Sequence, residues 1–467
     1  MANNNQSQIA PTILILFGIS GHLSKNKVLP ALYHLYKDKL LPLQIQIIGL
    51  SRQQITIHKI FENVKLCSHI DEQDLANNIT EFKNSIEIIQ FDPNNIDDYL
   101  KLKQHVIDFK NQFNFKNVNL LFYLSIPPQV FLSVIKNLGE SNLNKLDSTI
   151  KSKILVEKPF GYDLKSAQNL IFKTNEYFNE DQIFRIDHYL AKETAQNILT
   201  FRRFNPLFQT AWNNQHIKNI DIIASEKIDI EGRIEFYEEV GALRDLIQSH
   251  LFQLLALTTM TLPEDMSDTK AIHLARHAIL SEIKPFNTTK SIKENVIRGQ
   301  YSSYKQEVNN PHSMVETFAS IRLTINNSLW KGVPIRLITG KALKEKKTEI
   351  RINFGAVNES AQNQLTFRIQ PNEGIDIKLS VKQPGFDQRI QPAIMDFSYQ
   401  TTFEDHHHPD SYERVMIDSF KGDNTLFATS DEVLDSWYIL QPILDYWQKN
   451  KDLVIYKKGS LEEDILK

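Results

Sequence analysis

The chain begins with an alternation of apolar runs and helical patterns. Residues 12–18, TILILFG, form a continuous apolar run that ends at a glycine, and such a run favours a buried strand. The next segment, HLSKNKVLPALYHLYKDKL, repeats its apolar positions at helical spacing, and a second apolar run, QIQIIGLS, follows it. A strand, a helix and a strand in this order predict the start of a parallel α/β sheet.

The same alternation continues to about residue 185. Further strand-like runs are SIEIIQFD, VNLLFYLSIPP and SKILVEKPFG, and helical patterns such as residues 163–178 separate them. Strands that are apolar throughout indicate a sheet that is covered on both faces. We therefore expect residues 1–186 to form a doubly wound, Rossmann-like parallel sheet that binds a nucleotide.

The pattern changes after residue 187. Helical segments are expected around 190–210, 240–262 and 267–283, and strand-like runs with short polar connections follow them: ASIRLTI, IRLITGK, TEIRINF, QLTFRIQ and GIDIKLSV. Consecutive strands with short connections favour antiparallel pairing. Residues 187–467 are therefore predicted to form an α+β domain with a large, mainly antiparallel sheet. The last part, from DSYERVMIDSF onward, returns to a helical pattern.

Composition and charge limit the class of partner. The 467 residues are 41% apolar, and 53 Lys and Arg nearly balance 56 Asp and Glu. A net charge of −3 gives no general attraction to nucleic acid or to an anionic membrane. No uninterrupted apolar stretch reaches the roughly 18 residues that span a bilayer. We expect a cytoplasmic protein without nucleic-acid or membrane partners, in which a local basic cluster would bind any anionic ligand.

Three further features of the sequence predict no special chemistry. Cys67 is the only cysteine, so it cannot form a disulfide within the chain, and a small buried side chain is its expected role. The segment EDHHHPD at 404–410 lacks the spaced ligands of a zinc site, so no metal site is predicted. The N-terminal segment lacks a basic region and a cleavage site, which favours a strand over a signal peptide.

The loop GISGHLS, between the first strand and its helix, is the first candidate site. Gly18 and Gly21 would let backbone N–H groups approach a pyrophosphate at the start of a helix. Their Gly-x-x-Gly spacing, with Ser24 at the third small position, departs from the usual dinucleotide fingerprint, so a tight strand-to-helix turn is the alternative. The second strand leads to Arg52 rather than to an acid, which favours the 2′-phosphate of NADP over NAD. A solvated surface arginine is the alternative there.

The segment FRIDHYLAKE at 184–193 is the second candidate site. His188 and Lys192 are four residues apart, so on a helix they would share a face. With Tyr189 they could bind one anion, such as a phosphate monoester. The alternative is a helix N-terminus that Asp187 caps, with the lysine solvated.

Two more polar residues stand out. Lys158 precedes a proline in VEKPFG, which favours extended backbone and would place the lysine at the carboxyl end of a strand, where open α/β sheets bind ligands. His250 lies in the otherwise apolar helical segment VGALRDLIQSHLFQLLALTTM. Five α-helical residues turn by about 140°, so Asp245 would not share its face and another carboxylate should orient the imidazole. An exposed lysine and a core histidine are the respective alternatives.

In this order, the motifs resemble those of the glucose-6-phosphate dehydrogenase family over nearly the whole chain. They are GISGHLSKNKVLPALYHL, FYLSIPP, VEKPFG, RIDHYLAKE, EGRIEFYEEVGALRDLIQSHLFQ, VIRGQY, WKGVPIRLITGKAL, RIQPNEG and SYERVMIDSFKGDNTLFATSDEV. The resemblance implies oxidation of glucose 6-phosphate to the lactone, with hydride transfer to NADP, as the first step of the oxidative pentose phosphate pathway. It also implies a homodimer or homotetramer, because the family uses the large sheet for dimerisation.

The resemblance implies roles for individual residues. His250 matches the general base, Asp187 the carboxylate that orients it, and Lys158 a lysine that contacts substrate and cofactor. The expected substrate-binding residues are His188, Tyr189, Lys192, Glu226, Asp245, Lys341 and Lys346. The expected cofactor-binding residues are Gly18, Ile19, Ser20, Gly21, Leu23, Lys25, Arg52, Asp92, Tyr123 and Lys158.

A few positions depart from the family pattern. His22 stands where the family usually has an aspartate, and Ala191 replaces a glycine, so that its methyl group could crowd the phosphate site or stiffen a helix. Lys346 stands where some members have arginine, which removes bidentate hydrogen bonding. None of these changes removes a group that the chemistry requires. They leave one alternative, a catalytically weakened protein on the same fold that binds NADPH or a sugar phosphate.

Overall fold

The structure is a computed structural model that describes every residue except 1–8, 65–71, 113–116, 356–361 and 405–407. Cys67 and two of the three consecutive histidines therefore lie outside the described residues. The chain packs as two compact units. The first unit contains residues 1–161, 165–191 and 408–430, and the second contains residues 162–164, 192–407 and 431–467.

The first unit is built on a seven-stranded sheet with the order β15-β6-β5-β4-β1-β2-β3. All neighbouring strands are parallel except β15, which pairs antiparallel with β6. The strand order reverses at β1, between β2 and β4, and open α/β sheets bind ligands at the carboxyl ends of strands at such a point. The strands are β1 (Thr12–Phe17), β2 (Ile45–Ser51), β3 (Ile86–Gln90), β4 (Val118–Leu124), β5 (Ile150–Val156), β6 (Ile183–Ile186) and β15 (Phe427–Ala428).

Helices cover this sheet because their apolar faces pack on strands whose side chains are mostly buried. The strand β1, for example, is buried along its whole length. The helices are η1 (Ser24–Val28, a π-helix), α2 (Leu29–Lys37), α3 (Ile57–Phe61), α4 (Glu72–Asn84), α5 (Ile96–Gln112), α6 (Pro128–Glu140), α7 (Leu164–Asn175, whose first residue belongs to the second unit), η2 (Glu180–Gln182) and α16 (Ser411–Lys421).

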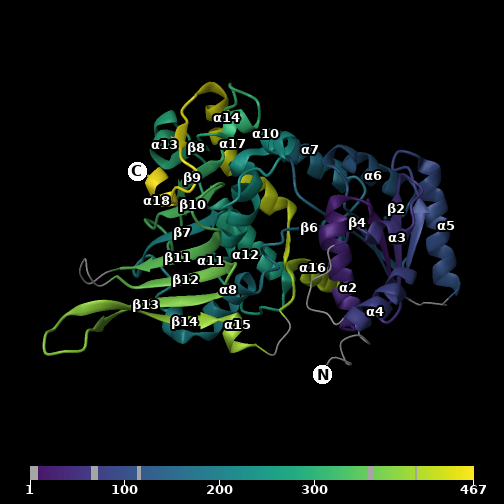
Figure 1. Ribbon diagram of the computed structural model, residues 1–467, viewed down its shortest axis with the longest axis horizontal. Coiled ribbons are helices and arrows are strands. Elements are labelled where there is room, and N and C mark those ends of the chain that lie inside the picture. Colours follow the sequence, from purple (N-terminus) through teal and green to yellow (C-terminus); the bar gives the residue numbers. More distant parts are fainter. Residues whose placement is uncertain (1–8, 65–71, 113–116, 356–361, 405–407) are drawn as a thin grey trace. The chain divides into compact units, whose positions relative to one another are not determined.

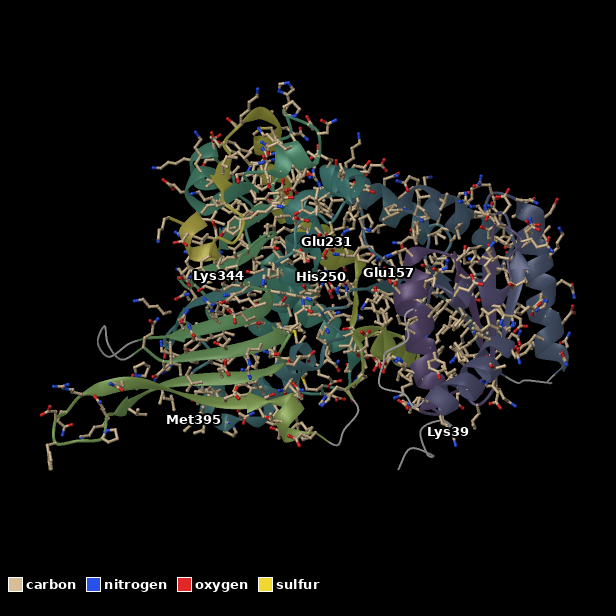
Figure 2. The ribbon with its side chains drawn as sticks, in the orientation of Figure 1. Lys39, Glu157, Glu231, His250, Lys344 and Met395 are labelled. Carbon is tan, nitrogen blue, oxygen red and sulfur yellow. The ribbon has the colours of Figure 1, made fainter. Side chains whose placement is uncertain are left out.

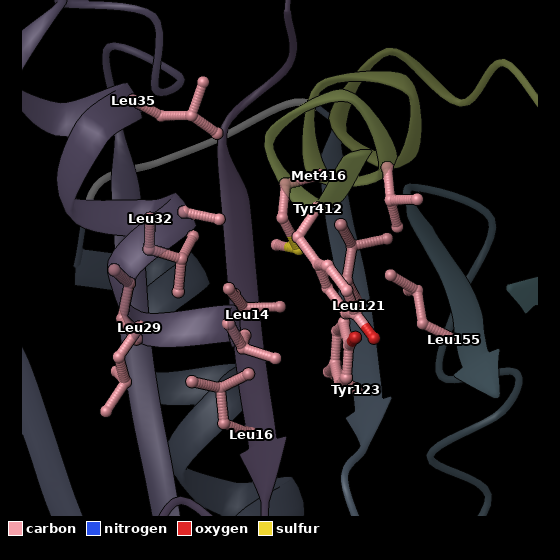
Figure 3. Close-up of a cluster of buried hydrophobic side chains, with 14 of the residues drawn as sticks. Leu14, Leu16, Leu29, Leu32, Leu35, Leu121, Tyr123, Leu155, Tyr412 and Met416 are labelled. Carbon is pink, nitrogen blue, oxygen red and sulfur yellow. The ribbon is translucent and has the colours of Figure 1, made fainter. Parts of the chain in front are cut away.

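The helix α16 comes from late in the sequence but belongs to the first unit. Figure 3 shows Tyr412 and Met416 of α16 pointing into the cluster that contains Leu121, Tyr123 and Leu155. The ion pair between His34 Nδ1 of α2 and a Glu413 carboxylate oxygen of α16, at 2.8 Å, adds a polar contact. The predicted domain boundary at residue 186 stays a prediction, but the packing unit that contains the parallel sheet includes this later segment.

The second unit is built on a nine-stranded sheet with the order β14-β13-β12-β11-β7-β10-β9-β8-β16. Its pairs are antiparallel except β7 with β10 and β8 with β16. The strands are β7 (Ile217–Ser225), β8 (Val296–Tyr301), β9 (Phe318–Leu323), β10 (Ile335–Gly340), β11 (Lys347–Phe354), β12 (Gln364–Gln370), β13 (Gly374–Lys382), β14 (Ile390–Ser398) and β16 (Val454–Tyr456). The prediction of a mainly antiparallel sheet is confirmed, and Figure 1 shows its long strands in teal and green.

Helices α8 and η3 pack against this sheet, on β12 and on β7 and β10 respectively. The three predicted helical regions are present: the regions around 190–210 and 240–262 are divided into shorter helices, and the region around 267–283 is the single helix α12. The helices of this unit are α8 (Glu193–Phe204), α9 (Pro206–Gln209), α10 (Ile234–Ala242), η3 (Leu243–Leu251, a π-helix), α11 (Phe252–Thr259), α12 (Thr269–Ser281), α13 (Thr289–Asn295), α14 (Tyr304–Glu307), α15 (Tyr399–Thr402), α17 (Ser430–Lys449) and α18 (Glu462–Ile465).

Candidate functional site

The glycine loop after β1 has a backbone that only glycine accommodates well. Gly18 has a φ of +74°, and a β-carbon at this position would lie 2.3 Å from the carbonyl oxygen of Ser125. The loop is closed by a hydrogen bond from Gly21 N to Gly18 O at 2.9 Å, and Ser24 Oγ donates to the same carbonyl at 3.0 Å. Gly18 therefore lies close to the backbone of Ser125, and the approach of this loop to a pyrophosphate stays a prediction. The helix that follows begins as a π-helix at Ser24.

This loop borders a cavity of about 290 Å³ in the first unit. The cavity lies at the carboxyl ends of β1, β2 and β4, where the strand order reverses. Its lining residues are Phe17, Gly18, Ser20, Gly21, Leu50, Ser51, Arg52, Phe91, Pro93, Asn94, Ser125, Ile126, Pro127 and Val130. Four predicted cofactor residues are among them: Gly18, Ser20, Gly21 and Arg52.

Arg52 is exposed and forms no ion pair with a described carboxylate. Its backbone carbonyl accepts a hydrogen bond from Gln90 Nε2 at 3.3 Å, which ties the end of β2 to the end of β3. A guanidinium that lines the cavity without a protein partner can bind a phosphate through two parallel hydrogen bonds. The cavity therefore fits the predicted preference for NADP.

Several predicted cofactor residues do not line this cavity. Ile19 is fully buried in the core of the first unit, and Leu23 packs partly against the same core. Asp92 accepts a hydrogen bond from Asn94 N at 3.0 Å and so holds the turn beside the cavity. Lys25 and Lys158 are half-buried outside the lining. Sequence reasoning missed Ser51, Asn94 and Ser125. The available signal was that Ser51 ends β2 and Ser125 directly follows β4, the two strands on either side of β1.

Tyr123 is completely buried, and its hydroxyl donates to Glu157 at 2.6 Å. Glu157 follows β5, directly before Lys158, and its position is labelled in Figure 2. Burial raises the pKa of Glu157 to about 7, while the hydrogen bond from Tyr123 and the charge of Lys158 act in the opposite direction. Tyr412 is a second hydrogen-bonding partner of this carboxyl group. Tyr123 therefore fixes a carboxyl group next to the predicted catalytic lysine.

The segment after β6 is a turn and not the helix on which the shared face of His188 and Lys192 was predicted. Leu190 N donates to Asp187 O at 3.1 Å, and Tyr189 N donates to a carboxylate oxygen of Asp187 at 3.0 Å. The helix α8 begins only at Glu193, with Lys192 as its N-cap residue. The alternative in which Asp187 caps a helix is therefore also wrong, because its carboxylate closes a turn instead.

Aromatic contacts hold His188 in this turn. Its imidazole stacks on the ring of Tyr412 of α16, with centroids 6.3 Å apart and planes at 20°. The ring of Tyr189 meets it edge-on at 5.0 Å. Ala191 is 2% exposed, and its methyl group belongs to the core of the first unit. This methyl group therefore packs in the core, which argues against crowding of a phosphate site.

In the second unit, Lys192 lies 3.8 Å from a carboxylate oxygen of Glu373. The other oxygen of Glu373 accepts hydrogen bonds from the backbone N–H and hydroxyl of Thr194, both at 3.3 Å. The carboxylate therefore fixes the start of α8 and the lysine that precedes it. Since Lys192 is half-buried, its ammonium group keeps access to an additional anionic partner.

The predicted sugar-binding residues converge at the ends of two parallel strands. Glu226 follows β7 and Lys341 follows β10, and their side chains form a close ion pair. The Lys341 ammonium also lies 5.3 Å from the ring centroid of Tyr237. Burial raises the pKa of Tyr237 well above its usual value, and the nearby carboxylates of Asp245, Glu316 and Glu226 contribute to this rise. Lys341 therefore joins Glu226 to one buried tyrosine, on which the charge of Asp245 also acts, and sequence reasoning missed this tyrosine.

His250 and Asp245 both lie on η3, and Figure 2 labels His250. The prediction that they occupy different faces of the helix assumed α-helical geometry, and this assumption is wrong. Residues 243–251 form a π-helix, whose i→i+5 hydrogen bonds bring residues five apart close to one face. His250 is 1% exposed. π-Helical turns often occur at functional sites, and here one contains both predicted residues.

A buried carboxylate supports the start of η3. Gly241 has a φ of +67°, and a β-carbon there would lie 2.5 Å from a carboxylate oxygen of Glu316. The same carboxylate accepts a hydrogen bond from Leu243 N at 3.0 Å. Negative charge at this helix end is favourable because the N-terminal N–H groups there have no partner within the helix.

Two of the predicted residues are not placed together with these groups. Lys346 is exposed in the turn before β11, whereas the neighbouring Lys347 pairs with Glu462 at 2.6 Å. Asp187 belongs to the first unit and His250 to the second, so their predicted pairing stays a prediction. Within the described residues, no group of three or more His, Cys, Asp or Glu side chains is arranged to hold a metal ion.

Comparison with known families accounts for both units. Residues 15–197 match the family described as "Glucose-6-phosphate dehydrogenase, NAD binding domain", and residues 199–465 match "Glucose-6-phosphate dehydrogenase, C-terminal domain". The chain belongs to the glucose-6-phosphate dehydrogenase family. The predicted family, fold class and enzyme class, an oxidoreductase, are therefore confirmed.

Individual members of the glucose-6-phosphate dehydrogenase family match nearly the whole chain. The glucose-6-phosphate 1-dehydrogenase of Chlamydia pneumoniae is 37% identical over an alignment that covers 96% of this chain and 91% of that protein. A structure described as "Glucose-6-phosphate dehydrogenase in complex with its substrate glucose-6-phosphate" has a TM-score of 0.91 and 33% identity, and the match covers 98% of this chain and 97% of that one. The Mycobacterium avium enzyme has a TM-score of 0.82 and 28% identity, with coverages of 97% and 95%.

Proposed function

We propose that this chain oxidises the C1 hydroxyl of glucose 6-phosphate to the lactone and passes hydride to NADP. The observation that carries the proposal most strongly is the group of Glu226, Lys341 and Asp245 around Tyr237, with His250 on the same π-helix as Asp245. This group offers hydrogen-bond acceptors for sugar hydroxyls and an imidazole for proton transfer. The match to a family member in complex with glucose 6-phosphate supports the same substrate.

In the proposed mechanism, His250 accepts the proton of the C1 hydroxyl, because an imidazole has a pKa near neutrality. Asp187 holds the proton on the other ring nitrogen and stabilises the imidazolium that forms. Glu226 and Asp245 accept hydrogen bonds from the sugar hydroxyls, and Lys341 holds Glu226 in place. These contacts fix the sugar so that little motion is needed in the reaction.

The phosphate of the substrate would be bound by His188, Tyr189 and Lys192. The stacking of His188 on Tyr412 and the pairing of Lys192 with Glu373 hold two of these side chains in defined positions. Binding energy from a phosphate remote from C1 can be spent on orienting the reacting carbon. Lys346 is exposed and stays a weaker candidate for this role.

The residues of the first unit fit NADP. Gly18 leaves the space beside Ser125 O that a β-carbon would fill, and Arg52 has a guanidinium available for a 2′-phosphate. When bound, NADP supplies the acceptor of the hydride. Lys158 follows the buried Glu157 at the end of β5, and we propose that it contacts both substrate and cofactor.

The decisive experiment follows absorbance at 340 nm after purified protein is mixed with NADP and glucose 6-phosphate. We expect NADPH to form, whereas a chain that only binds NADPH or a sugar phosphate would give no signal. His250→Asn should lower kcat by about 10² to 10⁴-fold and leave glucose 6-phosphate binding intact. His216→Asn changes an exposed histidine of the same unit and serves as the control. Unchanged turnover in His250→Asn would refute the assigned base.

We also propose a cytoplasmic homodimer or homotetramer. Within the described part of the chain, no helix is both long enough and apolar enough to cross a membrane.

The edge strand β14 exposes Ile390, Ile394 and Met395 at 53%, 66% and 64%. Exposed apolar side chains on an edge strand are typical of a surface that another chain covers. Sedimentation of the purified protein measures the assembly.

A further inference from the structure

Another cavity, lined mainly by polar residues, lies at the amino ends of β7 and β10, the strands whose carboxyl ends lead to Glu226 and Lys341. It has a volume of about 610 Å³ and surrounds the first residues of β7 and β10. Its lining residues are Asn214, Ile217, Lys218, Asn219, Asp221, Arg322, Lys331, Gly332, Val333, Pro334 and Arg336. We call it the basic cavity, because four of these side chains are cationic and only one is a carboxylate.

The basic cavity is separate from the proposed sugar site. Lys218 and Glu226 are eight residues apart on β7 and its extension, and a strand advances by about 3.3 Å per residue, so they are roughly 25 Å apart. Because β7 and β10 are parallel, their amino ends meet at one edge of the sheet and their carboxyl ends at the other. A ligand in the basic cavity would therefore not occupy the place of glucose 6-phosphate.

Within the described residues, the cationic side chains are not in ion pairs, although the charges of Arg322 and Arg336 act on Asp221. Among the described residues, none of the side chains of Lys218, Arg322, Lys331 and Arg336 forms an ion pair with a carboxylate. Arg322 of β9 and Arg336 of β10 are direct cross-strand partners. Like charges directly opposite each other on neighbouring strands destabilise a sheet. An anion between them would turn this repulsion into attraction.

Asp221 offsets only part of this charge. It is the cross-strand partner of Arg336 on the other side, and Asn219 Nδ2 donates to its carboxylate at 2.9 Å. Burial raises the pKa of Asp221, and the charges of Arg336, Arg351 and Arg322 act in the opposite direction. One half-buried carboxylate therefore faces several guanidinium groups. The net charge of the lining remains strongly positive in a chain whose total charge is −3.

We propose that the basic cavity is a binding site for a compact anion with two or more phosphate groups. Two guanidinium groups side by side match the paired oxygens of phosphate, and two lysines add point charges at the rim. Four separate cations match the charge of a polyphosphate better than that of a single sulfate or carboxylate. The volume is within the range of small-molecule pockets.

The test is a calorimetric titration of the full-length protein with inorganic tripolyphosphate. Saturating NADPH and glucose 6-phosphate are present throughout, so that the proposed active site is filled and cannot bind the probe. We expect one binding event per chain, with an affinity that falls as salt is added. Sulfate should bind at least tenfold more weakly than tripolyphosphate.

Variants locate the binding event. Arg322→Gln with Arg336→Gln should weaken tripolyphosphate binding at least tenfold. The matched control, Arg233→Gln with Arg389→Gln, removes two exposed arginines of the same unit outside the cavity and should leave it unchanged. If the first pair impairs folding, Lys331→Gln alone changes an exposed rim residue and should weaken binding severalfold.

Four results would overturn the proposal. They are no binding by the wild type, equal affinity for sulfate and tripolyphosphate, equal loss in the cavity and control variants, and dissociation of an oligomer by the cavity substitutions. The last result would identify this face as an interface between copies of the chain. All four are independent of the 340 nm assay, so a failure here leaves the proposed dehydrogenase activity standing.

Discussion

Replacing Glu157 by glutamine tests how the first unit holds a carboxyl group beside the predicted catalytic lysine. The side chain is partly exposed at the end of β5, but its carboxyl group is enclosed by Tyr123 and Tyr412. Burial is the largest cause that raises its pKa, from 4.5 to about 7. Glutamine has the shape of the protonated carboxyl group and can accept the hydrogen bond from Tyr123, so the variant mimics the neutral state at every pH.

The size of this effect on stability follows from the linkage between proton binding and folding. A pKa that is higher in the folded state means that folding favours the proton, so this contribution to stability is fully present below pH 4.5 and is lost as the pH rises through about 7. A rise of the pKa from 4.5 to about 7 corresponds to about 3 kcal/mol at most, and solvent access lowers this figure. The free energy of unfolding of the wild type should therefore fall between pH 5 and pH 7 more steeply than that of Glu157→Gln.

Urea unfolding at pH 5, 6, 7 and 8, followed by circular dichroism, measures this difference. Tryptophan fluorescence gives an internal control, because all four tryptophans lie in the second unit: Trp212, Trp330, Trp437 and Trp447. Glu140→Gln removes an exposed carboxylate that pairs with Lys136 at 3.7 Å, and it should retain the pH dependence of the wild type. If Glu157→Gln also retained that dependence, the carboxyl group would be ionised throughout and the argument from burial would be wrong.

Three substitutions test the binding residues. Arg52→Ala should raise KM for NADP far more than for NAD, because only NADP has the 2′-phosphate. Steady-state kinetics in which KM rises equally for both cofactors would contradict that role. Gly18→Ala should raise KM for NADP about tenfold or more. The left-handed backbone alone costs an alanine roughly 1–2 kcal/mol, and its β-carbon would meet Ser125 O. An unchanged KM in a cofactor titration would refute the role of this loop. Glu226→Gln should raise KM for glucose 6-phosphate at least tenfold, because it leaves the buried Lys341 without its carboxylate partner. A normal KM would show that Glu226 does not bind the substrate.

Local patterns were sufficient for the fold class and the glycine loop. The continuous apolar run of β1, followed by Gly18, predicted both a buried parallel strand and a turn that needs glycine. These features depend on residues that are neighbours in the sequence. The strands β6, β7, β8, β14, β15 and β16 were not identified. For β14 the reason is physical, because most of its side chains are exposed and give no clear apolar alternation.

Other features depend on contacts that no local pattern contains. The sequence of residues 243–251 has the apolar spacing of a helix, but nothing in it distinguishes i→i+5 from i→i+4 hydrogen bonds. Tyr412 lies more than two hundred residues after His188, yet its ring stacks on that imidazole because α16 packs in the first unit. The spacing of His188 and Lys192 favoured a helix, but hydrogen bonds to Asp187 close a turn there instead.

Strand direction explains why the predicted residues meet where they do. In the first unit, Gly18, Arg52 and Lys158 each follow a parallel strand, so the strands deliver them to one edge of the sheet. The second sheet is mainly antiparallel, and successive strands of such a sheet end at opposite edges. Its pair β7 and β10 is an exception, and Glu226 and Lys341 follow these two strands. An antiparallel pairing would have separated the glutamate from the lysine by the length of the strand, so this one parallel pair is what makes their contact possible.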